Sequence, residues 1–191
     1  MQRDESTTGA ICPCHFIWNY AIIYTDKRQE REGKIMKQKI WNLAIETPEG
    51  VLMLEINQMI MYNADDVAGV ILSAVIQGKK YSWEADTTEN ALVSLDRSLP
   101  ENWHIKSCLS CRFGHFCPIG DYDNELFCVT DFEPKSARDL WHVTEDDFER
   151  KKRSRSLFDY CNRYEKQSNE YFTYNDYSSK INDKTQGRII L

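Results

Sequence analysis

The sequence predicts an α+β domain, in which two or three helices cover an antiparallel sheet and a cysteine-rich metal-binding loop projects from one end. Three observations lead to this prediction. Alternating apolar residues flank a turn at 47–50, apolar residues recur at helical spacing in later segments, and four cysteines lie between Cys108 and Cys128. In 191 residues we expect one main domain over 11–178, with the cysteine-rich loop at 108–128. Flexible tails are expected at 1–10 and 179–191.

The first half of the domain is predicted to open with strands. Branched and aromatic residues over 16–24 favour a strand, and the charged run over 26–34 then reads as a solvated loop. Apolar and polar residues alternate over 41–46 and again over 52–56. Pro48 and Gly50 lie between these two runs, where a turn needs them, so the sequence predicts a β-hairpin here.

Two helices are predicted after the hairpin, separated by a short strand at 79–85. The first begins at Asn63, ends at Gly78 and has an apolar side at helical spacing, made of Val67, Val70, Ile71, Ala74 and Val75. The second follows the capping pair Asp86 and Glu89, with Ala91, Leu92, Leu95 and Leu99 inward and Pro100 at its end. Both helices are expected to lie on the sheet.

The cysteine loop is expected to hang between a brief strand at 103–105 and another at 126–132. A third helix is predicted from Thr144, with acidic residues in its first turn. Its apolar side is formed by Phe148, Leu157, Phe158, Cys161 and Tyr164, so Cys161 reads as a small buried apolar residue. The aromatic residues over 171–177 are expected to fold back on the domain.

Charge and composition narrow the class of partner. Thirty acidic against twenty-four basic residues give a formal charge of −6, which repels nucleic-acid phosphates and anionic membranes. We therefore expect a protein partner with a basic or neutral surface, and neither nucleic acid nor a membrane. No run approaches the roughly twenty apolar residues that cross a bilayer. We expect the chain in the cytoplasm, where its seven cysteines would be thiols, metal ligands or redox groups instead of disulfides.

The spacing Cys108-x2-Cys111-x5-Cys117-x10-Cys128 is the strongest chemical signal. A two-residue gap lets both sulfurs face one ion across a tight turn, as in structural zinc sites, and His115 offers a substitute fourth ligand. Two alternatives stay open. The thiols could hold an iron–sulfur cluster, or they could be reduced, buried cysteines lining a small core. The role of the pair Cys12 and Cys14 also stays open.

The unit Cys108-x2-Cys111-x5-Cys117-Pro118 resembles the cluster-binding tail of CRISPR-associated and helicase-linked exonucleases, and the auxiliary-cluster segment of some radical enzymes. The resemblance implies an iron–sulfur enzyme. In those nucleases the cluster accompanies a carboxylate core with a Glu-x-Lys element, to which Glu133-Pro134-Lys135 would correspond, after Asp121 and Asp123. The proline suits a central strand badly, and here this element follows the cysteines instead of preceding them.

A longer tract is similar to uncharacterised bacterial proteins that are grouped as a domain of unknown function. It runs over 103–177 and carries Cys-Leu-Ser-Cys-Arg-Phe-Gly at 108–114, Leu-Trp-His-Val-Thr-Glu-Asp at 140–146 and Tyr-Asn-Asp-Tyr at 174–177. The resemblance implies a bacterial cytosolic protein and transfers no catalytic residues. We expect a non-enzymatic, zinc-stabilised binding or regulatory protein, with an immunity-like role among the candidates; the alternative is an iron–sulfur electron carrier or nuclease-like enzyme.

Overall fold

Two antiparallel sheets and short helices form the part of the chain that the computed structural model describes, residues 35–64, 66–118 and 125–182. This confirms the α+β class. The five-stranded sheet has the order β4-β3-β2-β1-β5 and the three-stranded sheet the order β6-β7-β8. The elements are β1 (Ile35–Thr47), β2 (Gly50–Asn63), β3 (Asp66–Ile76), β4 (Lys79–Ala85), α1 (Thr88–Ser98), β5 (His104–Ile105), β6 (Gly114–His115), β7 (Glu125–Cys128), α2 (Ala137–Thr144), α3 (Asp147–Arg153), β8 (Ser154–Ser156) and α4 (Tyr177–Asn182).

The predicted hairpin is confirmed and is longer than the sequence pattern indicated. Strands β1 and β2 pair antiparallel from Ile35 opposite Tyr62 to Thr47 opposite Gly50. Thr47 closes the turn because its hydroxyl donates to the Gly50 carbonyl (2.9 Å) and accepts from the Glu49 N–H (3.2 Å). Leu43 lies opposite Leu54, and both side chains face the core.

The helix predicted over 63–78 is wrong, since this segment is strand β3. Its inward residues Val70, Leu72 and Ala74 alternate with more exposed neighbours, which is the period of a strand. Gly78, the predicted end of this helix, lies instead in the turn of a β-hairpin. Gln77 and Gly78 both have positive φ, 51° and 79°, as a two-residue turn between twisted antiparallel strands requires.

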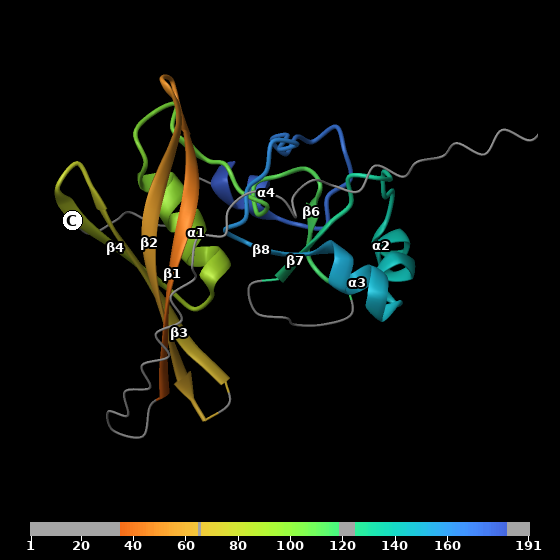
Figure 1. Cartoon of the computed structure of the whole chain (residues 1–191), viewed down its shortest axis with the longest axis horizontal. Helices are drawn as coiled ribbons and strands as arrows, with labels where there is room; N and C mark the ends of the chain where they lie inside the picture. Colours follow the sequence, from red (N-terminus) through yellow and green to blue (C-terminus); the bar gives the residue numbers. More distant parts are fainter. Residues whose placement is uncertain (1–34, 65, 119–124, 183–191) are drawn as a thin grey trace, which may run out of the picture.

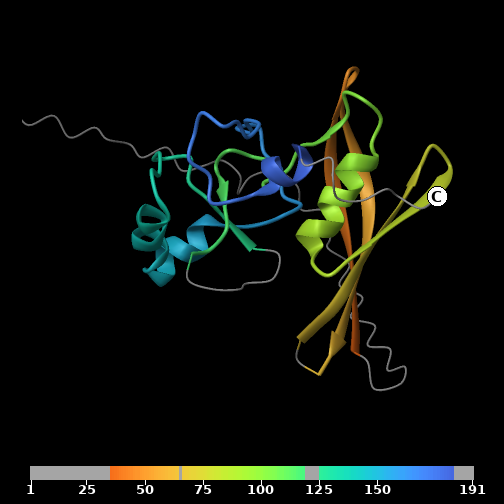
Figure 2. The same ribbon diagram turned by 180° about the vertical axis from the view of Figure 1, so that it is seen from behind.

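Helix α1 covers one face of the large sheet, behind the strands in Figure 1 and in front of them in Figure 2. The predicted helix over 86–99 is confirmed, although Thr87 caps it in place of Asp86. The Gln58 amide donates to the Thr88 hydroxyl (2.8 Å) and the Trp83 indole donates to the Ser98 hydroxyl (2.9 Å). Of the helices described, α1 alone makes extensive contacts with this sheet, where two or three were expected.

The remaining elements form a smaller lobe beside α1 (Figures 1 and 2). The third predicted helix is partly wrong, because α3 begins near the expected place but ends at Arg153. The chain then enters β8 and an irregular segment that contains Cys161. Leu157 and Phe158 are nevertheless buried, in one core cluster that also includes residues of the large sheet. The Trp41 and Phe158 rings stack at 4.7 Å between centroids, which joins the lobe to the sheet.

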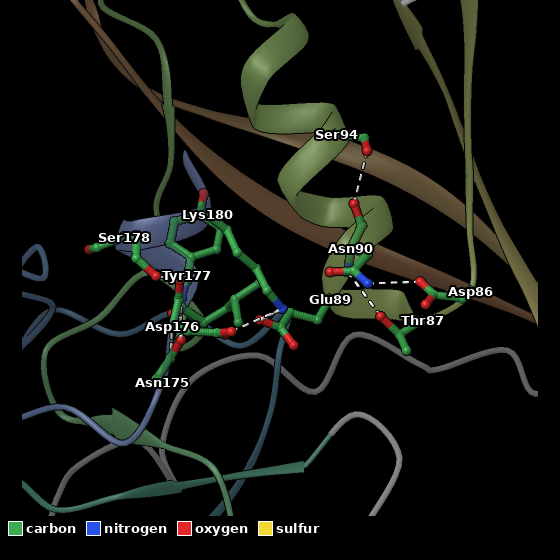
Figure 3. A network of polar contacts seen from close by, with 12 residues as sticks. Asp86, Thr87, Glu89, Asn90, Ser94, Asn175, Asp176, Tyr177, Ser178 and Lys180 are labelled. Carbon is green, nitrogen blue, oxygen red and sulfur yellow. Dashed lines mark hydrogen bonds and ion pairs between the residues drawn. The ribbon is translucent and has the colours of Figure 1, made fainter. Parts of the chain in front are cut away.

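Helix α4 is attached to α1 by polar contacts (Figure 3). The Lys180 ammonium lies 2.9 Å from the Glu89 carboxylate and 3.3 Å from that of Asp176. The pKa of Glu89 is raised to about 7, mainly by burial and also by a hydrogen bond with Asp176, while Lys180 opposes the rise. The buried Tyr177 hydroxyl donates to Asp96 of α1 (2.7 Å). Helix α4 therefore extends past residue 178, where a tail was expected to begin.

Several predictions concern other parts of the chain. The strand over 16–24, the tail at 1–10 and the pair Cys12 and Cys14 lie outside the described residues. Within the described residues, no helix is long and apolar enough to span a bilayer.

Candidate metal centre at the cysteine turn

The chain makes a compact turn over 107–114 directly after β5, which we call the cysteine turn. Its backbone closes in steps, with the Ser110 N–H donating to Ser107 O (3.1 Å), Cys111 N–H to Cys108 O (3.4 Å) and Gly114 N–H to Cys111 O (3.0 Å). The Ser110 hydroxyl accepts from the Ser107 N–H and donates to the carbonyl of Ile105. These bonds hold the two-residue gap between Cys108 and Cys111 in a tight conformation.

Gly114 allows the turn to close. A Cβ atom at this position would lie 2.0 Å from the carbonyl oxygen of Cys108 and 3.4 Å from that of Cys111. Such contacts are far inside the van der Waals limit, so only glycine lets β6 leave the turn so close to its own beginning.

Cys128 lies next to this turn. In the small sheet, Gly114 of β6 pairs with Cys128 of β7, and His115 pairs with Phe127. The backbone of Cys128 therefore lies beside the turn that carries Cys108 and Cys111, although the side chains of the three are not arranged as a metal site. Cys117 follows β6, where the Phe116 N–H donates to Tyr174 O (2.8 Å).

The segment over 159–167 runs along the other side of the cysteine turn. The Cys108 N–H donates to Asp159 O (2.6 Å), the Arg112 N–H donates to Glu165 O (2.8 Å), and Cys111 forms an antiparallel bridge with Lys166. Cys161 lies between these anchored ends, in a turn closed by the Tyr164 N–H donating to Cys161 O (3.2 Å). The sequence pattern predicts Cys161 on a helix, and this prediction is wrong, because Cys161 lies in an irregular segment beside the cysteine turn.

Two buried amides fix the backbone of the cysteine turn from the C-terminal side. The Gln167 side chain donates to the carbonyls of Leu109 (3.0 Å) and Cys111 (3.4 Å), and the Asn175 side chain donates to those of Leu109 (2.8 Å) and Gly114 (3.2 Å). Leu109 itself is fully buried. The expectation of a projecting loop with little apolar surface is therefore wrong for this part of it, which is embedded in the lobe and already held by hydrogen bonds.

The thiols of this region influence one another electrostatically. Burial raises the pKa of Cys108 well above its usual range, and the Asp159 carboxylate and the thiols of Cys128, Cys111 and Cys161 raise it further. Burial also raises the pKa of Cys111, although backbone hydrogen bonds from Glu165 and Phe113 lower it. Without a cation, both groups are neutral thiols at physiological pH. A bound divalent cation would reverse this preference.

His115 is poorly suited to be the substitute ligand. It is 1% exposed, and its Nδ1 accepts the backbone N–H of Tyr174 (3.0 Å). Because Nδ1 is the acceptor, the ring proton of the neutral imidazole lies on Nε2. Coordination through Nε2 would require the proton to move to Nδ1, which would break the hydrogen bond from the Tyr174 N–H. Burial lowers the pKa of His115 to about 4, so the ring stays neutral and serves as a packing residue against Phe172.

The thiols do not form a ready-made ligand set. Across the described ranges, no three histidine, cysteine, aspartate or glutamate side chains are close enough together to hold a metal ion. The five cysteines at 108, 111, 117, 128 and 161 are free thiols, with no disulfide among them. The cysteines therefore supply several soft sulfur donors to one region, but their described positions do not form a metal site.

The nuclease-like element takes a different place from the one that the resemblance implies. Glu133 and Lys135 lie in the loop before α2, where the Lys135 N–H donates to the capping residue Asp139 (2.8 Å). They are on no strand, whereas a catalytic Glu-x-Lys element belongs to one. Asp121 and Asp123 lie outside the described residues.

Comparison of the sequence with models of known protein families, with curated proteins and with solved structures finds no match. The similarity of the tract over 103–177 to a bacterial domain of unknown function therefore stays a prediction.

Proposed function

We propose that the chain is a non-enzymatic binding or regulatory protein of the bacterial cytosol, whose cysteine turn is stabilised by a structural metal ion, with zinc as the preferred ion. One observation carries this proposal. The chain closes so tightly at Gly114 that the backbone of the turn carrying Cys108 and Cys111 lies beside the backbone of Cys128, which is distant in sequence. With Cys117 these are the ligands that the sequence predicts.

A metal would offset the main electrostatic disadvantage of this arrangement. Gathered thiols repel one another once ionised, and burial raises the free-energy cost of each charge. A divalent cation stabilises the thiolates and releases their protons, so binding energy becomes folding energy. The proposal requires the thiols to turn toward a common point by rotation about their Cα–Cβ bonds, because the described side chains are not arranged around one. Four protein ligands leave no position for substrate, which favours a structural role.

The exposed face of the large sheet supports the binding half of the proposal. Opposite α1, this face carries every methionine of the chain except Met1, namely Met36, Met53, Met59 and Met61. Beside them, Ile40 is 47%, Met53 53% and Val75 61% exposed. Methionine side chains adapt to differently shaped apolar partners and are common on binding surfaces. We call the surface formed by these residues the methionine face.

The net charge indicates the character of the partner. At −6 the chain attracts a protein with a basic surface and does not repel one with a neutral surface, and apolar groups of that protein would cover the methionine face. An immunity-like role, in which this protein blocks a basic toxin, is one function of this kind.

Metal analysis of the purified full chain tests the metal half. A colourless protein with about one zinc per chain, released by a thiol-modifying reagent, supports the proposal. A brown protein that contains iron and sulfide supports the iron–sulfur alternative instead. Protein prepared under reducing conditions without either metal, and unable to take up zinc, contradicts both.

The binding half is tested by Val75→Glu, which places a charge on the methionine face. Its matched control is Phe148→Glu, because Phe148 is an apolar residue of α3, in the other lobe, and is 73% exposed. Quantitative pull-down from the source cell should recover a partner with the wild type and the control and lose it with Val75→Glu. Equal recovery by both variants shows that the methionine face is not the binding surface.

A further inference from the structure

Strand β1 has an open edge along most of its length. Strand β5 lies next to β1 on the side opposite β2, but it pairs only with Ile45 and Glu46. Within the described residues, no strand pairs with this side of β1 over 35–43. At about 3.3–3.4 Å per residue, the open edge is roughly 30 Å long.

Alternate residues of β1 direct their backbone groups to this edge. The Lys106 N–H donates to the carbonyl of Ala44 (2.8 Å), so the groups of Ala44 point away from β2. The register between β1 and β2 is continuous, with no bulge, and successive residues of a strand bond to opposite sides. The N–H and C=O groups of four more residues therefore point to the open edge, namely Met36, Gln38, Ile40 and Asn42.

A row of unpaired N–H and C=O groups is a template for another extended strand. The opposite edge of the sheet, β4, is only seven residues long and carries the exposed charges of Lys80 and Glu84, which discourage pairing. On β1, the ammonium groups of Lys37 and Lys39 lie over aromatic rings of their own sheet, 4.8 and 5.5 Å from the ring centroids. Ile40, in the middle of the open edge, is 47% exposed. The edge of β1 is therefore suited to pairing, and that of β4 is not.

The sequence offers an occupant for this edge in residues 16–24, which lie outside the described residues. This segment matches the open edge in length and consists mainly of the branched and aromatic residues that favour strands. Its large residues recur at every second position, the period of a strand, as Phe16, Trp18, Tyr20, Ile22 and Tyr24.

The connection to β1 permits an antiparallel return. Residues 25–34 join the segment directly to Ile35, the first residue of β1. A link of this length reaches up to roughly 33 Å, so it can place 16–24 alongside any part of the open edge. Its charged residues suit a solvated loop between two strands.

We propose that residues 16–24 add a sixth, antiparallel strand to the large sheet at the open edge of β1. The inference does not depend on the proposed metal ion or on the binding partner. Its consequence is that the chain closes its own edge against pairing with other molecules. A partner that adds a strand to β1 would first have to displace this segment.

Amide hydrogen exchange of the full chain, resolved by residue with NMR, tests the proposal. The outward amides, those of Gln38, Ile40 and Asn42, should exchange as slowly as the neighbouring amides that bond to β2, to within about tenfold. The rates should not depend on protein concentration. Fast exchange of the outward amides beside slow neighbours overturns the proposal, and protection that rises with concentration overturns it in favour of a second copy of the chain.

Proline substitutions identify the occupant. Of two adjacent residues in a strand, one directs its N–H to the neighbouring strand, so either Tyr20→Pro or Ala21→Pro must remove a bond to β1. That variant should accelerate exchange of the outward amides by tenfold or more and leave the amides that bond to β2 unchanged. Tyr20→Phe and Ala21→Val keep both N–H groups and are the matched controls, with the rates of the wild type. If neither proline changes the outward amides, residues 16–24 are not the occupant.

Discussion

The most direct test of the cysteine turn is Gly114→Ala, which adds one methyl group. The new Cβ would lie 2.0 Å from the carbonyl oxygen of Cys108, while ordinary contacts between such atoms lie at roughly 3.5 Å. The backbone of the turn and strand β6 must therefore separate by more than about 1 Å. Rigid backbone surrounds the site, so no side chain can rotate to make room.

The magnitude follows from two effects. Overpacking of this kind costs about 1–3 kcal/mol, and weakening the Gly114 N–H bond to Cys111 O (3.0 Å) adds about 1 kcal/mol. Alanine also restricts the unfolded chain more than glycine does, which stabilises the folded state by somewhat less than about 1 kcal/mol. This gain applies because the φ of Gly114 is not in the left-handed region, so alanine can adopt it. We expect a loss of about 2–3 kcal/mol, which lowers Tm by roughly 5–12 °C for a chain of this size.

The control is Gly69→Ala in β3. There the added Cβ meets the terminal methyl of Met61 at 3.0 Å, and that flexible side chain can move. Its free energy of unfolding should change by less than about 1 kcal/mol. Urea unfolding followed by tryptophan fluorescence, at equal metal content, measures both variants. The reasoning about the turn is refuted if Gly114→Ala is no less stable than Gly69→Ala.

Two further predictions concern the contacts between the lobe and the rest of the domain. The pKa of Glu89 is about 7 in the folded protein, against 4.5 for the free group, so the folded state holds a proton that the unfolded state has lost. The contribution of this carboxyl to the free energy of unfolding therefore falls as the pH rises from about 4.5 through 7. In Glu89→Gln, Tm should decrease less over that pH range than it does in the wild type. An equal decrease in both proteins would show that Asp176 and Lys180 offset the effect of Glu89. Phe158→Ala removes the ring stacked on Trp41 and should cost about 3–5 kcal/mol in urea unfolding. Phe158→Leu keeps most of the buried volume and should cost under half as much. Equal costs would contradict this expectation, because they would show that the stacked ring and not the buried volume supplies the stability.

The local sequence predicted correctly those helices and strands whose own residue pattern agrees with the packing that surrounds them. The hairpin of β1 and β2 combines alternation with a turn of fixed chemistry, and α1 combines helical spacing with a cap and a terminal proline. For β3 the same reasoning failed, because the apolar run over 67–76 contains residues at helical spacing and also Val70, Leu72 and Ala74 at the two-residue spacing of a strand. Pairing with β2 and β4 decides between them, and no local pattern contains that information.

In the candidate site, too, some features follow from the local sequence and others only from the tertiary structure. The spacing of Cys108 and Cys111 and the glycine at 114 are properties of the sequence, and they determine a tight turn that presents two thiols. Which other cysteine lies beside them is a tertiary property. Register in the small sheet brings Cys128 opposite Gly114, and hydrogen bonds of the 159–167 segment hold Cys161 over the turn. Distance along the chain carries no information about such contacts, because they depend on how separate segments pair and pack.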